Sequence, residues 1–170
     1  RLRDLDDDGC CELIVGNSQQ SGVWRWRENE KASGKSGWQR TEYRLPGSAR
    51  IVNSKGQDAG MRFVDLNEDR LVDVIFSNEN HSSIHLFESI ENGWTREVKP
   101  REQENALDLP VISRNGTNNG VWFAERHMWV QNELTNRLPD GVDRRSFIDL
   151  LGNQDPRPKS PAASLSSIRV

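Results

Sequence analysis

The sequence predicts an all-β fold, a partial β-propeller of four-stranded antiparallel blades with a short helix and a linker towards the C-terminus. Three observations predict it. An acidic segment that begins at Asp4 recurs at Asp65. Each copy continues as short apolar runs separated by Gly, Asn, Asp and Ser, which is typical of antiparallel strands. Each copy holds four such runs within about 45 to 60 residues, the size of one propeller blade.

The internal repeat keeps one spacing over its first part. Residues 4–17 align with residues 65–78, so that their numbers differ by a constant offset of 61. The same offset places Val23–Trp26 on Ile84–Phe87. In the second copy the expected strands are Met61–Val64, Val72–Phe76, Ser83–Phe87 and Trp94–Val98.

The later part of the repeat is shorter in the second copy. Gly37-Trp38 matches Gly93-Trp94, where the numbers differ by only 56, which predicts that five residues are lost from the loop that holds Lys31 to Ser36. Tryptophans recur at blade positions, so we expect them to pack in the core or between blades, with a carbohydrate-stacking surface as the alternative. These are Trp24, Trp26, Trp38 and Trp94.

A third, degenerate copy follows. Met128–Glu133 resembles Val74–Glu79, and the acidic loop is expected upstream, at Asn115–Gly120. The oxygens of that segment are neutral, so we do not expect it to hold a divalent ion well. Helical periodicity is confined to Arg144–Leu151, with Arg144 and Arg145 at its solvated start.

The predicted organisation has three parts. Residues 1–151 form the partial propeller, with blades at about 4–60, 61–105 and 106–140. Residues 152–164 form a Pro-rich linker, and residues 165–170 would begin a following domain. Two or three blades cannot close a ring that needs four to eight, and Arg1 falls inside a repeat, so we expect the chain to belong to a longer protein.

The first acidic loop has the pattern of a calcium site. Alternating side chains in a tight loop can converge on one ion, and Ca²⁺ takes six to eight oxygen ligands. A glycine follows where the chain must turn sharply. The expected ligands are the carboxylates of Asp4, Asp6 and Asp8, the backbone carbonyl of Cys10, and Glu12. An EF-hand is not expected, because Val15 stands where its bidentate Glu would be.

The second acidic loop predicts a weaker calcium site. Arg70 stands where the first loop has Gly9, and a non-Gly residue in a left-handed conformation costs roughly 1 kcal/mol. The expected ligands here are Asp65, Asn67, Asp69, the backbone carbonyl of Leu71, and Asp73.

Composition and motifs argue against several function classes. The formal net charge of −3 gives no electrostatic reason to expect nucleic acid or anionic lipid as a partner. No apolar run approaches the ~20 residues that span a bilayer, so no membrane insertion is expected. Cys10 and Cys11 are adjacent and form no metal clip. No nucleophile or phosphate-loop motif is present, so no catalytic residue and no organic cofactor are expected.

The two acidic loops, each followed by a β-branched run, resemble FG-GAP/VCBS repeats over about residues 1–100. The resemblance implies a calcium ion in each such loop of an integrin-like propeller. A narrower resemblance links Gly116–Phe123, Trp129–Glu133 and Asp143–Phe147 to large secreted proteins of planctomycete type. In those, such a segment precedes a sugar-dehydrogenase-like propeller and often a c-type haem domain with CxxCH, a motif missing here. It implies an extracytoplasmic location, periplasmic, secreted or on the cell surface.

The expected function is that of a non-catalytic binding or scaffolding module in a larger protein. Its expected partners are the neighbouring domain of the same chain and, beyond it, a glycan or protein ligand. Adhesion through an integrin-like face is a variant with the same loop chemistry. The alternative is part of a membrane-associated dehydrogenase with quinone- or haem-linked chemistry located after residue 170.

Overall fold

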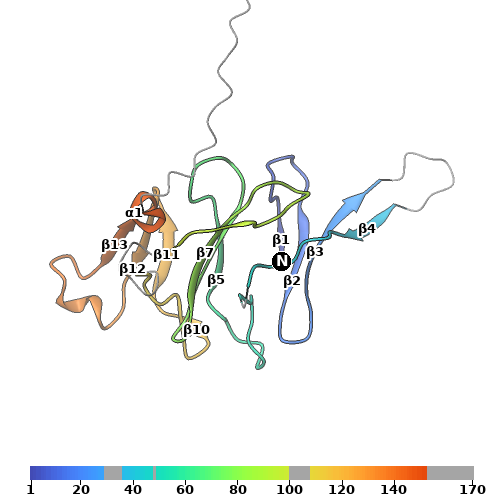
Figure 1. The fold of residues 1–170 in the computed structure, drawn as a ribbon. Helices are drawn as coiled ribbons and strands as arrows, with labels where there is room; N and C mark the ends of the chain where they lie inside the picture. The colour runs from blue at the N-terminus through green and yellow to red at the C-terminus, as the bar shows by residue number, and fades with distance from the viewer. Residues whose placement is uncertain (29–35, 48, 100–107, 153–170) are drawn as a thin grey trace, which may run out of the picture.

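Three antiparallel sheets lie side by side in the computed structural model, and a small hairpin stands between the second and the third (Figure 1). The structure describes residues 1–28, 36–47, 49–99 and 108–152. The expected linker beyond Gly152 and the segment 165–170 lie outside these residues. So does most of the loop from Lys31 to Ser36. None of the helices that the structure describes is long and apolar enough to cross a membrane.

The first two sheets are four-stranded meanders in which strands adjacent in the chain pair with each other. The first contains β1 (Leu2–Arg3), β2 (Glu12–Gly16), β3 (Ser21–Arg27) and β4 (Gly37–Arg40). The second contains β5 (Met61–Val64), β6 (Asp73–Ser77), β7 (Ser82–Leu86) and β8 (Arg96–Glu97). The four strands expected for the second copy are therefore present: β5 has the expected bounds, and the ends of the other three are shifted by one or two residues.

The strand register repeats as well. Leu13 pairs with Trp24 in the first sheet, and Val74 pairs with His85 in the second. Both members of the pair are displaced by the constant offset of the repeat. Because a slip of one residue would turn every side chain to the opposite face, this agreement makes the two sheets equivalent face by face.

The sheets stack in series through two apolar clusters. In the middle sheet Val74 and Phe76 belong to the cluster shared with the first sheet, whereas Ile75 belongs to the cluster shared with the third. Every residue of β6 is consequently buried. Figure 1 shows this central green sheet between the blue and orange ones. The all-β class is confirmed, and none of the sheets formed by the described residues is closed.

The third sheet replaces its acidic loop with a tight turn. It contains β11 (Val121–Ala124), β12 (His127–Val130) and β13 (Asp143–Ser146), and so extends past residue 140. Ala124 pairs with His127, so Glu125 and Arg126 alone connect the first two strands. Their φ angles of 49° and 64° are those of a primed hairpin turn.

The placement of the third acidic loop at Asn115–Gly120 was therefore wrong. That stretch covers the turn between β9 (Ser113–Arg114) and β10 (Thr117–Asn118) and the approach to β11. The segment has a polar composition similar to that of the acidic loops. Its residues precede β11, the first strand of the third sheet, whereas each acidic loop follows the first strand of its sheet.

The helix also begins later than expected. Arg144 and Arg145 lie in β13, where Arg144 pairs with Trp129. The helix α1 spans only Phe147–Leu151. The Ser146 side chain caps it by accepting a hydrogen bond from the Asp149 amide, and three of its apolar residues enter the second cluster. The two arginines are not helical because they pair with β12 as part of β13, and the Ser146 cap begins the helix after them. A 3₁₀ turn, η1 (Thr135–Arg137), precedes β13.

Trp38 and Trp94 do not occupy equivalent positions. Arg40 pairs with Trp24, and Glu97 pairs with His85, the counterpart of Trp24. Arg40 and Glu97 are therefore equivalent, and their numbers differ by 57 instead of the expected 56. The net loss is four residues. Trp94 is buried at 8% exposure, whereas Trp38 is 43% exposed and meets Trp26 edge to face. A shift of one residue reverses the face that a side chain occupies.

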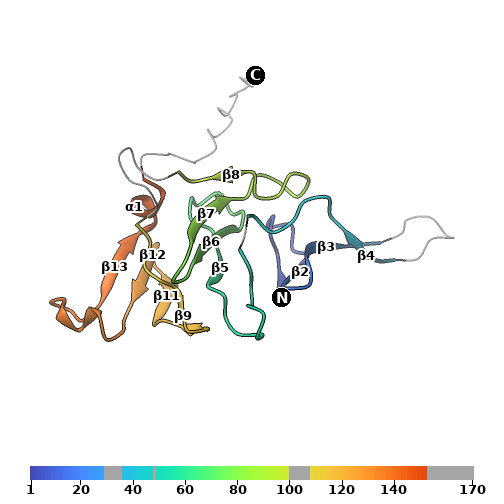
Figure 2. The ribbon, with the colours of Figure 1, turned by 60° about the horizontal axis from the view of Figure 1, so that its bottom comes forward.

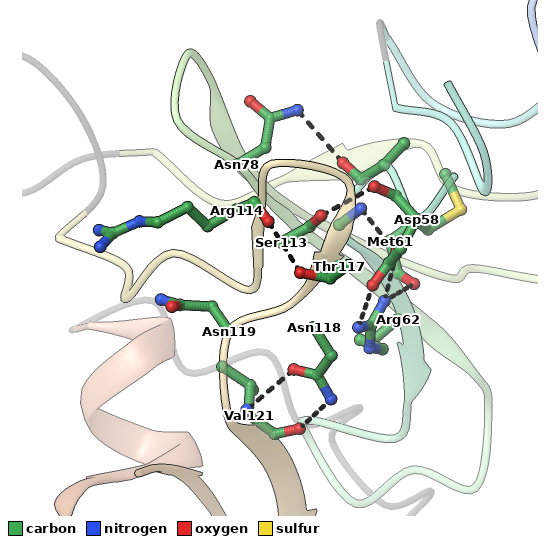
Figure 3. A network of polar contacts seen from close by, with 12 residues as sticks. Asp58, Met61, Arg62, Asn78, Ser113, Arg114, Thr117, Asn118, Asn119 and Val121 are labelled. Carbon is green, nitrogen blue, oxygen red and sulfur yellow. Dashed lines mark hydrogen bonds and ion pairs between the residues drawn. The ribbon is translucent and has the colours of Figure 1, made fainter. Parts of the chain in front are cut away.

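A polar junction joins the second sheet to the β9–β10 hairpin (Figure 3). The Ser113 hydroxyl donates a hydrogen bond to the carbonyl oxygen of Asp58 at 2.8 Å, and the Asn78 amide donates to that of Ala59 at 3.2 Å. The Asp58 carboxylate accepts two hydrogen bonds from Arg62. Figure 2 shows the hairpin beneath the central sheet, between it and the third sheet.

Candidate metal centre

Both acidic loops fold by the same hydrogen-bond pattern. The Asp4 carboxylate accepts hydrogen bonds from the backbone amides of Asp8 and Gly9. Each backbone amide that donates to an acidic side chain of the first loop has a counterpart in the second loop at the offset of the repeat. In the second loop the Asp65 carboxylate accepts hydrogen bonds from the backbone amides of Asp69 and Arg70. Asp69 accepts the amide hydrogen of Leu71, as Asp8 accepts that of Cys10. Asp73 accepts the amide hydrogen of Leu66, as Glu12 accepts that of Leu5.

The backbone conformations of the two loops agree at their tightest points. Asp7 and Glu68 have φ angles of 58° and 63°. Gly9 and Arg70 have φ angles of 85° and 71°. The position of Gly9 therefore does require a left-handed backbone, as the sequence suggested, and Arg70 adopts it at a cost.

The first loop gathers three carboxylates at one point. Among the residues that the structure describes, Asp4, Asp6 and Asp8 are the one group of three acidic, His or Cys side chains whose ligand atoms all lie within 4.8 Å of one another. Three of the five ligands predicted for this loop thus lie close together. Clustered carboxylate oxygens of this kind can hold a hard cation such as Ca²⁺.

Glu12 lies close enough to the same cluster for Asp6 and Asp8 to act on its charge. Its side chain is 0% exposed, and one oxygen accepts the amide hydrogen of Leu5. The other oxygen, Oε1, and Oδ1 of Asp6 are buried and accept no hydrogen bond. Burial raises the pKa of both the Glu12 and the Asp6 carboxyl groups, and the neighbouring carboxylates add to the shift. Two buried oxygen atoms without donors fit a site that takes a cation.

Arg25 contacts the first acidic loop, and the sequence interpretation did not single it out. Its Nη2 atom hydrogen-bonds to Asp8 and lies 3.4 Å from Asp6, and its Nε atom lies 3.7 Å from Oε1 of Glu12. A signal for it existed: Arg25 aligns with Leu86 in the second copy, so it is a charge introduced at a position that is apolar in the other repeat.

The second loop is organised differently. The Nδ2 atom of Asn67 donates a hydrogen bond to Asp69 at 2.8 Å, so these two side chains face each other. Asp73 is 0% exposed, and its two oxygens accept the amide hydrogens of Leu66 and Phe87. Burial raises its pKa to about 7 against the effect of these bonds. Asp73 thus ties the loop to the end of β7 instead of converging with the other carboxylates.

The remaining predicted ligands lie on the loop backbones. The Cys10 amide donates to Asp8, the Leu71 amide donates to Asp69, and the thiol of Cys10 is exposed.

Neighbouring loops are also joined by ion pairs. Arg70 lies 4.0 Å from Asp7, and Arg126, in the turn of the third sheet, pairs with Glu68. Since Glu68 is the counterpart of Asp7, this exposed ion pair recurs between successive sheets.

Comparison of the chain with models of protein families, with curated proteins and with solved structures finds no match.

Proposed function

We propose that this chain is a calcium-binding segment of a β-propeller that serves as a non-catalytic binding or scaffolding module of a larger extracytoplasmic protein. The observation that carries the proposal is the first acidic loop, where the carboxylates of Asp4, Asp6 and Asp8 converge and one buried oxygen each of Asp6 and Glu12 accepts no hydrogen bond. The residues that would hold the ion there are Asp4, Asp6, Asp8, Glu12 and the carbonyl of Cys10.

The second loop would bind calcium through the equivalent residues. Its backbone conformation is the same, but the Asn67 amide nitrogen faces Asp69 and would have to turn its oxygen inward. Both oxygens of Asp73 are already hydrogen-bonded. These features support a site of lower affinity than the ligand set alone would give.

The propeller proposal is supported by the stacking of equivalent faces. Ile14 faces the second sheet, and its counterpart Ile75 faces the third. Sheets that pack in this repeated way, each on the next, are the arrangement of successive blades. The open face of the first sheet carries Leu13, Trp24 and Trp26, whose counterparts in the second sheet are buried, so we expect a further sheet or a partner to cover it.

An extracytoplasmic location agrees with this chemistry. Calcium modules outside the cytosol work with dissociation constants of about 10⁻⁴ to 10⁻³ M, which match a partly exposed loop. The dehydrogenase alternative places its chemistry after residue 170 and assigns no role to the loops described here.

The test is thermal unfolding in millimolar Ca²⁺ and in excess chelator. An ion that binds only the folded state raises the melting temperature by mass action, so calcium should stabilise the protein and Mg²⁺ much less. Asp6→Asn should reduce the calcium effect. Asp7→Asn is the matched control, because Asp7 lies in the same loop with its carboxylate largely exposed. Identical melting curves in calcium and chelator would contradict the proposal.

A further inference from the structure

The guanidinium of Arg25 sits among the carboxylates of the first acidic loop. It contacts Asp8, Asp6 and Glu12, and its side chain is only 17% exposed. Those are the oxygens that a divalent cation would need. A guanidinium and a metal ion cannot share them at the same distances, because both are positive and would repel each other in a partly buried site.

The positive charge of Arg25 occurs at the first loop and not at the second. In the second copy the equivalent position is Leu86, which is 3% exposed and packs in the apolar cluster between the second and third sheets. The repeat folds with either residue at this position of the third strand. Arg25 is therefore not a requirement of the blade, and its effect falls on the acidic loop.

One guanidinium does not balance the charge that it faces. Three carboxylates contact it, and Asp4 lies within the same cluster. The Nε atom of Arg25 stays 3.7 Å from Oε1 of Glu12, too far for a hydrogen bond, so that fully buried oxygen keeps no donor. The loop thus retains negative charge that can attract a further cation while Arg25 is in place.

The Arg25 side chain also has an alternative position available beside the loop. It lines a surface cavity of about 280 Å³ between β3, β4 and the loop after β7. Two carboxylates, Glu42 and Glu91, line the same cavity together with two further arginines, Arg27 and Arg40. A rotation of the long side chain towards this cavity would exchange one set of carboxylate partners for another. Such an exchange keeps the guanidinium paired after it leaves the loop.

We propose that Arg25 is an intramolecular competitor of the divalent cation at the first loop, and that it leaves towards Glu42 and Glu91 when the ion binds. The inference rests on the proposed calcium function and sets its affinity. In the metal-free protein Arg25 acts as the counter-ion that keeps the loop folded. The first loop therefore binds calcium with low affinity because Arg25 competes for its oxygens, and it binds calcium tightly only when Arg25 is removed.

The experiment is calorimetric titration of the full chain with Ca²⁺, comparing the wild type with Arg25→Leu, which installs the residue of the second copy, and with Arg25→Gln. Losing a charge-assisted pair that must be broken on binding should raise the affinity of the first loop about tenfold or more. Arg27→Gln is the control for net charge, because Arg27 lies two residues further on the same strand and beside the same cavity, and its substitution removes one positive charge without removing the contacts of Arg25 with the loop. Adding Asp6→Asn to Arg25→Gln should abolish the gain.

A second measurement covers variants that fold poorly without the ion. In excess chelator Arg25→Gln should melt below the wild type, and calcium should raise its melting temperature by more. The double substitution Glu42→Gln and Glu91→Gln should lower calcium affinity when Arg25 is present and leave it unchanged in Arg25→Gln.

The outcomes separate the two proposals. Equal calcium affinities at the first loop in the wild type and both Arg25 variants would overturn the role of Arg25 and leave the calcium site standing. If no variant, including Arg25→Leu, bound calcium, the calcium function itself would fall and this inference with it. A gain in Arg27→Gln equal to that in Arg25→Gln would reduce the effect to net charge and contradict direct competition.

Discussion

Arg70 holds the same left-handed backbone conformation as Gly9, with a φ angle of 71° against 85°. The two residues occupy one position of the repeat, immediately after the last acidic residue of the loop. The glycine adopts this conformation freely, and a Cβ atom there would meet no other atom within 4 Å. The difference between the loops at this point is therefore one of backbone strain and not of packing.

Arg70→Gly should stabilise the protein by up to about 1 kcal/mol, because it removes the cost of a left-handed L-residue. Gly9→Ala should destabilise it by a similar amount for the same reason. Urea unfolding in excess chelator measures both changes without the influence of bound ions. If Gly9→Ala had no effect on the free energy of unfolding, the argument from strain would be wrong.

The buried carboxyl of Asp73 should make stability depend on pH. Its folded-state pKa, about 7, lies above the ordinary value, so the native state binds more protons than the unfolded state between the two values. The stability it contributes is full below the unfolded pKa and is lost as pH rises through 7. The expected slope is at most about 1.4 kcal/mol per pH unit.

Asp73→Asn tests this assignment. Chemical unfolding of the metal-free protein between pH 5 and 8 should show the decline in the wild type and a flatter profile in the variant. The variant should also be weaker overall by about 1 to 3 kcal/mol, since its amide nitrogen cannot accept the hydrogen bond from Phe87 or Leu66. A profile unchanged by the substitution would show that another group titrates.

Trp94 and Trp38, which differ by one residue in register, should contribute very differently to stability. Trp94 is buried, packs edge to face on Phe87, and donates a hydrogen bond to the carbonyl oxygen of Val72. Trp94→Ala should cost about 3 to 5 kcal/mol of unfolding free energy. The half-exposed Trp38 is the matched control, and Trp38→Ala should cost under about 1 kcal/mol. Comparable losses would mean that the repeat register assigned to β4 and β8 is incorrect.

In the second and third sheets, an asparagine just after the second strand joins the sheet to the segment before it. The Asn78 side-chain oxygen accepts two backbone amide hydrogens, and its nitrogen donates to Ala59. Asn132 likewise donates to the carbonyl oxygen of Asn119. Asn78→Asp keeps the acceptor but sets a carboxylate against a carbonyl oxygen, so it should destabilise the protein by about 1 to 3 kcal/mol. Thermal melting checks it.

Asn17 provides the comparison for that substitution. It accepts the same pair of amide hydrogens in its own turn, from Gln19 and Gln20. Asn17→Asp keeps both bonds and should change stability by no more than about 0.5 kcal/mol. A loss as large as that of Asn78→Asp would move the cause from the Ala59 contact to the turn itself.

Much of the fold could be predicted from local patterns. The constant offset between the copies carried the register of β2 with β3 over to β6 with β7, because each pair is closed by a short turn with an asparagine at its start. Prediction failed after the variable loop, where counting from Gly37 and Gly93 misplaced Trp94 by one residue. In the third copy, composition alone could not separate a connecting hairpin from an acidic loop.

The sequence by itself determined the all-β class, the repeated acidic loops and the identity of the residues that could hold an ion. These follow from alternation, turn residues and carboxylate spacing, which act over a few residues. Only the tertiary structure decided which oxygens are buried without donors, that Asp73 is tied to the end of β7, and that Arg25 reaches the first loop. Those relationships join strands and loops far apart in the chain, and they depend on how the strands pair, which local spacing does not specify.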